Sequence, residues 1–181
     1  MTRMLVRVLL ALVAALALGL TARDAAATVV KGVTLEHSIR ASHAILVGQV
    51  VGSRAYAAQD GRILTGFRVR VEESLKGPFR AGETAEITTT GGDLDGRRLR
   101  VPGEASYRRG ERVLVQLERI DGRWHTLGLA SGKWSVTRDA RGDHLTRDLS
   151  QLAVAGPARL SAGPVPLGEF RRLVRETDAA R

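Results

Sequence analysis

The residue types best suited to metal binding and acid–base chemistry are the four histidines, but their spacing does not bring them together. They fall in four different segments, and none begins an HExxH motif: His37, His43, His125 and His144. This pattern predicts four ordinary histidines, no bound metal and no catalytic residues. Two alternatives stay open: a zinc site assembled by the fold, and an enzyme that uses His125, His144 and Asp143.

Other short motifs also fail to define a catalytic or cofactor site. Asp93-Leu94-Asp95-Gly96 resembles the start of a calcium loop, but the glutamate that completes such a loop is missing, so a tight turn is the better interpretation. The string SGKWS departs from a phosphate-binding loop at two positions, and GLASG does not match GxSxG. Glu72 and Glu73 are neighbours on a predicted strand, so they face opposite sides and cannot act as a pair. We therefore expect no cofactor.

Arginine and tryptophan side chains are better candidates for a binding surface. Five arginines are predicted on solvent-facing sides of strands, where they could hold an anionic envelope polymer or lipid headgroup. The two tryptophans could mark a ligand-binding face, although aromatic residues at alternating strand positions are more often core. The complete set is Arg68, Arg70, Arg97, Arg98, Arg100, Trp124 and Trp134. Arg141-Gly142-Asp143 could engage a receptor, but the tip of a hairpin explains it better.

Short strands separated by turns must position these residues. Asp60-Gly61 and Asp121-Gly122 each lie between β-like segments and predict hairpins. From Phe67 to Val71, apolar residues alternate with arginines, which predicts one core face and one solvent face. The apolar run AILVGQVV predicts a strand buried on both faces. In LKGPFRAGE, Gly77-Pro78 cannot continue a central strand, so this segment is a corner and not an anion-binding loop.

These elements predict a mainly β fold, a small closed antiparallel barrel over residues 28–152, because roughly six to eight short strands follow one another with little helix between them. A short helix begins after Thr34. Residues 153–165 are rich in proline and glycine, which predicts an extended connector. Residues 166–181 predict an amphipathic helix that docks on the barrel.

The first 27 residues have the layout of a signal peptide. Arginines precede the apolar run VLLALVAALALGL, and Ala25 and Ala27 fit the small residues before a cleavage site. We expect cleavage after Ala27 and a periplasmic or secreted product without a transmembrane span. An uncleaved membrane anchor is the alternative. The chain has no cysteine, so its stability must come from packing and hydrogen bonding.

The charge of the chain is strongly basic, with 28 Lys and Arg residues against 19 Asp and Glu and a net charge of +9. Predicted cleavage removes three arginines and one aspartate, so the basic character survives. The arginines are spread along the chain rather than gathered in one block, and an exported protein meets little nucleic acid. We therefore expect no nucleic-acid partner.

The order of five segments is similar to that of an exported bacterial domain of OB-like or netrin-like barrel type, which occurs alone or ahead of matrixin-type metalloproteases. The segments are AILVGQV, TGFRVRVEESLKG, ITTTGG, RRGERVLVQL and GLASGKWSV. The resemblance implies a non-catalytic, secreted barrel linked to proteases, but no HExxH is present to carry over a protease activity. The tissue inhibitors of metalloproteinases share such a barrel, yet their inhibition depends on an N-terminal cysteine and disulfides that this chain lacks.

From these observations we expect an exported, non-catalytic binding module that contacts an exported or envelope protein, a protease among the candidates. The arginine-mediated binder of anionic polymer or lipid headgroups and the enzyme with distant His and Asp residues are the alternatives.

Overall fold

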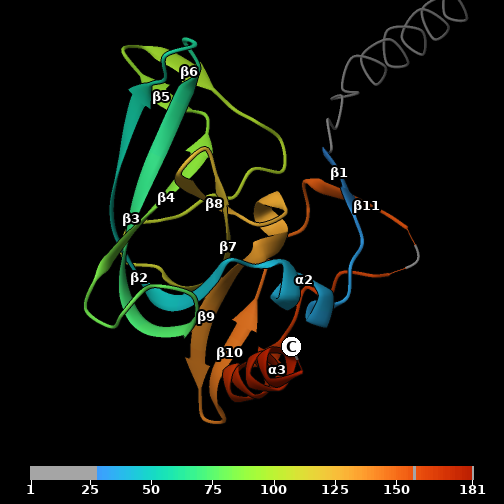
Figure 1. Ribbon diagram of the computed structural model, residues 1–181. Helices are drawn as coiled ribbons and strands as arrows, with labels where there is room; N and C mark the ends of the chain where they lie inside the picture. Colours follow the sequence, from blue (N-terminus) through green and yellow to red (C-terminus); the bar gives the residue numbers. More distant parts are fainter. Residues whose placement is uncertain (1–27, 157, 181) are drawn as a thin grey trace, which may run out of the picture.

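The computed structural model describes residues 28–156 and 158–180, so the predicted signal peptide and its cleavage site lie outside the described residues. Within this part the fold is mainly β, as predicted, with one large sheet and the two α-helices α2 (Leu35–Ala41) and α3 (Leu167–Ala179) (Figure 1). No helix in the described ranges has both the length and the apolar character needed to cross a bilayer.

The longest hairpin joins β2 (Ala44–Ala57) to β3 (Ile63–Lys76) through the predicted Asp60-Gly61 turn. Asp60 Oδ1 accepts a hydrogen bond from the Arg62 N–H at 3.0 Å, and Gly61 has a φ of 78°, which glycine adopts without strain. The register of the two strands shifts at three points. Such irregularities bend a strand pair, and both strands curve across the molecule (Figure 1).

Eight of the described strands form the main sheet, in the order β12-β10-β9-β7-β2-β3-β4-β8. Strand β8 pairs with both β7 and β4, so β7, β2, β3, β4 and β8 form a continuous circuit of hydrogen-bonded strands. The link between β4 and β8 is a single parallel pair, Ile87 with Trp124, and the other pairings of this sheet are antiparallel. Besides β2 and β3, the strands are β4 (Thr84–Thr90), β7 (Arg112–Ile120), β8 (Arg123–Thr126), β9 (Lys133–Asp139), β10 (Gly142–Thr146) and β12 (Val165–Pro166).

The first part of β2, residues 44–48, and the middle of β7, residues 113–117, are buried on both faces, as predicted for the apolar residues of AILVGQVV, whereas Gln49 of that run is exposed. One face of each strand contributes to a cluster that we call the inner core, and the other face contributes to the outer core. The inner core contains Ala44, Leu46, Val50, Val69, Val71, Ala85, Ile87, Ala105, Tyr107, Val113, Val115 and Leu117. The outer core contains Ile39, Ile45, Val47, Leu114, Trp134, Val136, Leu145, Leu167, Phe170 and Val174.

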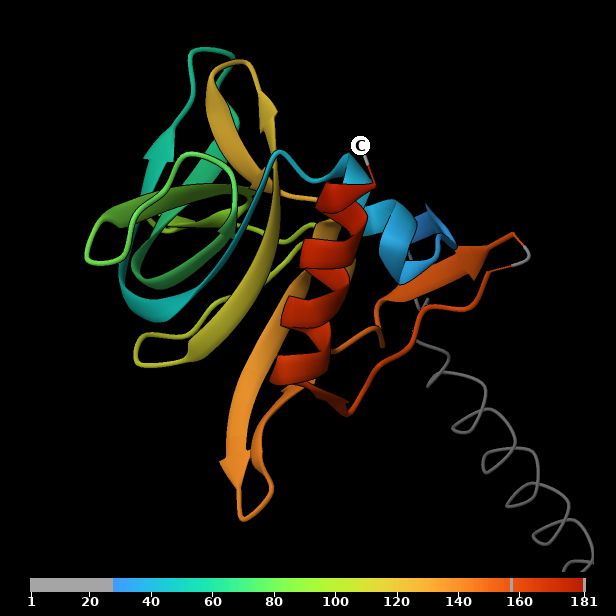
Figure 2. The ribbon, with the colours of Figure 1, turned by 60° about the horizontal axis from the view of Figure 1, so that its bottom comes forward.

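The two helices cover the outer core (Figure 2). The side chain of Thr34 caps α2 as predicted, because its Oγ1 accepts a hydrogen bond from the N–H of His37 at 3.2 Å. Helix α3 buries Leu167, Phe170 and Val174, which recur on one face as an amphipathic helix requires. It contacts α2, β10, β12 and β3, so the C-terminal helix docks on the β structure.

The predicted extended connector at residues 153–165 begins with a strand. Strand β11 (Leu152–Ala155) occupies that part and pairs in parallel with β1 (Thr28–Lys31). The sequence of this segment does not reveal the pairing, because its partner strand lies at the other end of the domain. A separate two-stranded hairpin, β5 (Gly92–Leu94) with β6 (Arg97–Leu99), stands at the end of the molecule away from α3 (Figure 1).

Candidate functional site

A cleft of about 490 Å³ opens beside the β5–β6 hairpin. We call it the hairpin cleft. Its walls come from the first half of β3, the end of β4 with Gly91 and Gly92, residues 99–106, Ala130 with the beginning of β9, and the loop 148–151. Segments far apart in the chain therefore meet around one concave surface, which is the usual form of a ligand site.

The floor of the cleft continues the inner core. Side chains alternate along β3, so Thr65 and Phe67 face the same side as the buried Val69 and Val71. Phe67 packs against Tyr107, with 5.0 Å between the ring centroids. The cleft is thus the end of the inner core that side chains leave unfilled, with an apolar floor and polar groups around it.

Two glycines allow the chain to turn tightly at the cleft wall. Gly91 and Gly92 have φ values of 108° and 138°, and a Cβ atom on Gly92 would come 2.4 Å from the Thr65 hydroxyl oxygen. That hydroxyl donates a hydrogen bond to the carbonyl of Gly91 at 2.6 Å. Strand β4 thus ends at Thr90, and the turn that follows it forms part of the cleft wall.

Glu104 is a half-buried carboxylate that faces the cleft. Its two oxygens accept hydrogen bonds from the N–H groups of Thr90 at 3.2 Å and Ala105 at 3.3 Å. Burial raises the pKa of Glu104 above its ordinary value, although these two hydrogen bonds act in the opposite direction. The two hydrogen bonds therefore hold the carboxylate in place, but they offset only part of the cost of burying its charge.

Lys133 and Ser135 of β9 also line the cleft and share one partner, Glu111. The ammonium of Lys133 forms a short ion pair with Glu111 Oε1, and the Ser135 hydroxyl donates to the same oxygen at 2.7 Å. Burial opposes ionisation of Glu111, but these contacts and the Arg108 N–H together hold its pKa below the ordinary value. Because Lys133 is already a donor to a carboxylate, it does not offer a free base to activate the Ser135 hydroxyl.

The predicted arginine surface is not one surface. Arg68 and Arg70 are exposed on the face of β3 that points away from the hairpin cleft. Arg97 and Arg98 are exposed on β6, and Arg100 lines the cleft itself. The sequence pattern gives the exposure of these side chains correctly, but it cannot show that β5 and β6 leave the main sheet as a separate hairpin.

The two tryptophans have different environments, and neither lines the cleft. Trp134 is fully buried in the outer core, so its assignment to a binding surface is wrong and the core alternative holds. Phe170 of α3 packs against Trp134, with 6.1 Å between the ring centroids. Trp124 is half-buried against Phe79, at 5.2 Å between ring centroids, with Arg119 over its ring at 5.5 Å.

The residues of the enzyme alternative do not gather into a metal site. His125 lies on β8, whereas Asp143 and His144 lie on β10 near the other edge of the main sheet. Burial lowers the pKa of His125. Within residues 28–156 and 158–180, no group of three His, Asp or Glu residues has the geometry to hold a metal ion.

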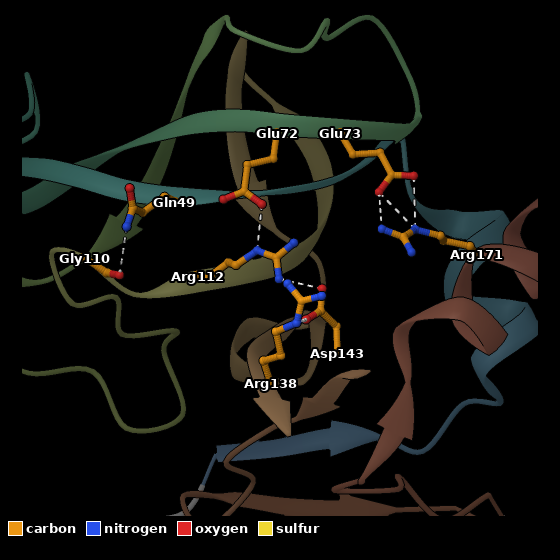
Figure 3. A network of polar contacts seen from close by, with 8 residues as sticks. All are labelled: Gln49, Glu72, Glu73, Gly110, Arg112, Arg138, Asp143 and Arg171. Carbon is orange, nitrogen blue, oxygen red and sulfur yellow. Dashed lines mark hydrogen bonds and ion pairs between the residues drawn. The ribbon is translucent and has the colours of Figure 1, made fainter. Parts of the chain in front are cut away.

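Asp143 instead belongs to a network of ion pairs on the outer side of the sheet (Figure 3). Arg112 bridges Glu72 and Asp143, at 2.6 Å to each carboxylate, and Arg138 lies 3.7 Å from Asp143. The turn of this hairpin is at residues 140–141, so Gly142 and Asp143 are strand residues and not the tip. The Arg-Gly-Asp string is therefore no free recognition loop.

Glu72 and Glu73 also form ion pairs on the outer side of the sheet. Glu72 pairs with Arg112 of β7, whereas Glu73 forms a two-pronged contact with Arg171 of α3, at 2.6 Å for the shortest pair (Figure 3). Each carboxylate thus has its own arginine, which leaves no acid–base pair. These contacts join strands and helix, and we assign them to stability.

Sequence reasoning missed the cleft residues Thr65, Thr89, Glu104, Lys133 and Ser135. Each of them looks ordinary in its own segment, and only the fold brings them together. The nearest signal in the sequence is the long irregular stretch between ITTTGG and RRGERV, which is too long for a simple turn.

No protein-family model matches the chain, and no curated protein matches it significantly. The resemblance to OB-like or netrin-like domains therefore stays a prediction.

Proposed function

We propose that the circuit β7-β2-β3-β4-β8 is a small closed barrel of OB-like type. The support is the pairing of β8 with both β7 and β4, together with the inner core that these strands enclose. Such closure removes the exposed strand edges that would otherwise favour aggregation of an exported chain without disulfides.

On this scaffold we propose an exported, non-catalytic binding module that contacts a protein partner through the hairpin cleft. The observation that carries the proposal is the cleft itself: an unfilled end of the inner core, with an apolar floor around Phe67 and fixed polar groups such as Glu104 at its walls. An apolar cavity with a few convergent polar groups is the common form of a recognition site. An exported protease is the partner class that the resemblance suggests.

A second candidate function has a separate observation behind it. Arg68 and Arg70 are exposed, and neither forms an ion pair within 4.0 Å among the described residues. Two free guanidinium groups on one strand face could attract an anionic envelope polymer or lipid headgroup. Binding of this kind weakens steeply as salt is added.

The test is affinity capture from the exported fraction of the native host, using the full chain with a C-terminal tag at low and high salt. Ser106 is exposed and lines the cleft, so Ser106→Trp should block the cleft, and Ser53→Trp on the exposed part of β2 is the matched control. We expect a protein that survives high salt, is lost with Ser106→Trp and is kept with Ser53→Trp. N-terminal sequencing of the same material tests cleavage after Ala27.

Two outcomes would contradict the proposal. A partner that both tryptophan variants retain would move binding away from the cleft. Retention of anionic polymer alone, lost at high salt and in an Arg68→Gln, Arg70→Gln variant, would favour the second function.

A further inference from the structure

The hairpin cleft differs in charge from the chain as a whole. The chain is basic, with a net charge of +9. Four charged side chains line the cleft, two of each sign: Arg100, Lys133, Glu104 and Asp148. What these four groups contact decides which charge remains available to a ligand.

Both cations of the cleft are already paired with carboxylates that lie outside its lining. Lys133 forms its ion pair with Glu111, and Arg100 lies 3.6 Å from Asp93. Glu111 compensates the charge of Lys133. Arg100 shares the exposed Asp93 with Arg98, so its charge is only partly compensated.

Both carboxylates lack such a partner. No Lys, Arg or His nitrogen in the described part of the chain lies within 4.0 Å of a carboxylate oxygen of Glu104 or Asp148. Glu104 accepts hydrogen bonds from the N–H groups of Thr90 and Ala105, and Asp148 accepts one from the Ser150 N–H at 2.9 Å. Glu104 is half-buried in one wall, whereas Asp148 is exposed on the loop that forms another.

The apolar part of the cleft suits a long aliphatic stem. Phe67, Leu99 and Val101 line it together with the two carboxylates. Lysine and arginine side chains bury their methylene groups along apolar surface and present a charged end to a polar group. The free charge and the apolar walls of the cleft are both complementary to such a side chain.

We propose that the hairpin cleft receives a cationic side chain, lysine or arginine, of the protein partner, with Glu104 and Asp148 as its counter-charges. This proposal rests on the function proposed above. A free polyamine has the same charged group, but the function proposed above involves a protein partner, and we commit to the partner's side chain.

The proposal requires a defined pH dependence. The ionised form of Glu104 attracts the cation, so affinity should fall as the pH decreases through the raised pKa of Glu104 and level off above it. The titratable and charged groups that surround Glu104 are Lys133 and Asp148 in the cleft lining, Arg100 on its own segment, and Tyr107 and Glu111 behind them. Tyr107 stays neutral in this range because burial raises its pKa well above the ordinary value.

The experiment is an NMR titration of the isotope-labelled protein with four pentapeptides, Gly-Gly-X-Gly-Gly, in which X is lysine, arginine, norleucine or glutamate. 1,5-Diaminopentane is the free-amine probe. Glu104→Gln and Asp148→Asn each remove one counter-charge, and Asp121→Asn removes an exposed carboxylate from the β7–β8 turn outside the cleft as the control. Because Asp148 is exposed, its variant tests the proposal even if Glu104→Gln impairs folding.

We expect shifts at the cleft residues with the lysine and arginine peptides and none with norleucine or glutamate. Each counter-charge variant should weaken this binding by about tenfold, as expected for loss of a charged hydrogen bond, and Asp121→Asn should leave it unchanged. Equal binding of the norleucine peptide, or unchanged affinity in both counter-charge variants, would overturn the proposal. If 1,5-diaminopentane bound more tightly than the lysine peptide, the ligand of the cleft would be a free amine and not a protein side chain.

The same variants separate this inference from the function on which it rests. If Ser106→Trp abolishes capture of the partner but Glu104→Gln and Asp148→Asn do not, the cleft binds a partner without a cation and only the inference fails. If Ser106→Trp has no effect, the proposed function fails as well.

Discussion

The guanidinium of Arg147 lies over the ring of Trp134, with 4.0 Å between its Cζ atom and the ring centroid. The same guanidinium donates a hydrogen bond to the carbonyl of Ser161 at 2.6 Å and another, shorter one to the carbonyl of Ser131. No carboxylate lies within 4.0 Å of it among the described residues, and burial lowers the pKa of Arg147 to about 10. Arg147 thus fastens the segment around Ser161 to the turn before β9 without an ion pair.

Replacing Arg147 by alanine should therefore cost stability rather than binding. Loss of a desolvated cation–π contact and of two hydrogen bonds from a charged donor should lower the free energy of unfolding by about 2–4 kcal/mol. Urea unfolding followed by tryptophan fluorescence measures this difference. Arg54→Ala, at an exposed arginine of β2, is the control and should change stability by less than about 0.5 kcal/mol. Equal effects of the two substitutions would show that the stacking on Trp134 contributes nothing.

The alternating strands and the hairpins of this fold could be predicted because their causes are local. Val69 and Arg70 face opposite sides simply because successive side chains on a strand do so. The turn at Asp60-Gly61 needs only the residues that form it. Burial of both faces at the beginning of β2 was also readable, because residues 44–48 include no polar side chain to expose to solvent.

The cleft and the burial of Trp134 both depend on contacts between segments that are far apart in the sequence. Trp134 alternates with its neighbours like any strand residue, and it is covered by groups from distant segments, Phe170 of α3 and Arg147 among them. Glu104 and Lys133 meet around one cavity because segment 99–106 folds back over the end of the inner core. No local pattern of residue types encodes that return, so the charge balance of the cleft could not be predicted.

Two glycines should respond to alanine in opposite directions. A Cβ atom on Gly48, in the middle of β2, would come 2.3 Å from the backbone oxygen of Arg70 on β3, so the two strands would have to separate. We expect Gly48→Ala to lower the free energy of unfolding by about 2–3 kcal/mol. Gly168 lies in the first turn of α3 with open space where a Cβ would be, and Gly168→Ala should raise it by about 0.5–1 kcal/mol. Chemical denaturation of both variants provides the comparison, and a stabilised Gly48→Ala would mean that β2 and β3 are less closely apposed than described.

Two neighbouring residues of α3 should contribute unequally to its docking. Phe170 is fully buried in the outer core, whereas Arg171 forms its two-pronged pair with Glu73 near the surface, where its side chain is 33% exposed. Phe170→Ala should cost about 3–5 kcal/mol through lost burial and the cavity it leaves. Arg171→Ala should cost about 1 kcal/mol or less, because solvent screens a pair at this exposure. Thermal unfolding at low and high salt separates the two, since only the arginine variant should approach the wild type as salt is added. A larger effect of Arg171→Ala would make the ion pair the main attachment of the helix.

The ion pairs of Asp143 should make the folded state less stable at low pH. The hydrogen bond from Arg112 holds the pKa of Asp143 below its ordinary value of 3.8, and the charges of Arg112, Arg138 and Arg171 act in the same direction. A carboxylate whose pKa is lowered by folding stabilises the folded state above its unfolded pKa, and this stabilisation is lost as the pH falls through the folded value. Asp143→Asn should therefore lower the free energy of unfolding at pH 7 by about 1 kcal/mol, and the difference from wild type should shrink steadily below about pH 4. Asp121→Asn, in an exposed turn, is the control and should match the wild-type stability at pH 7 within about 0.5 kcal/mol. If the Asp143→Asn deficit persisted unchanged at pH 2, the shape of the side chain rather than its charge would account for the loss.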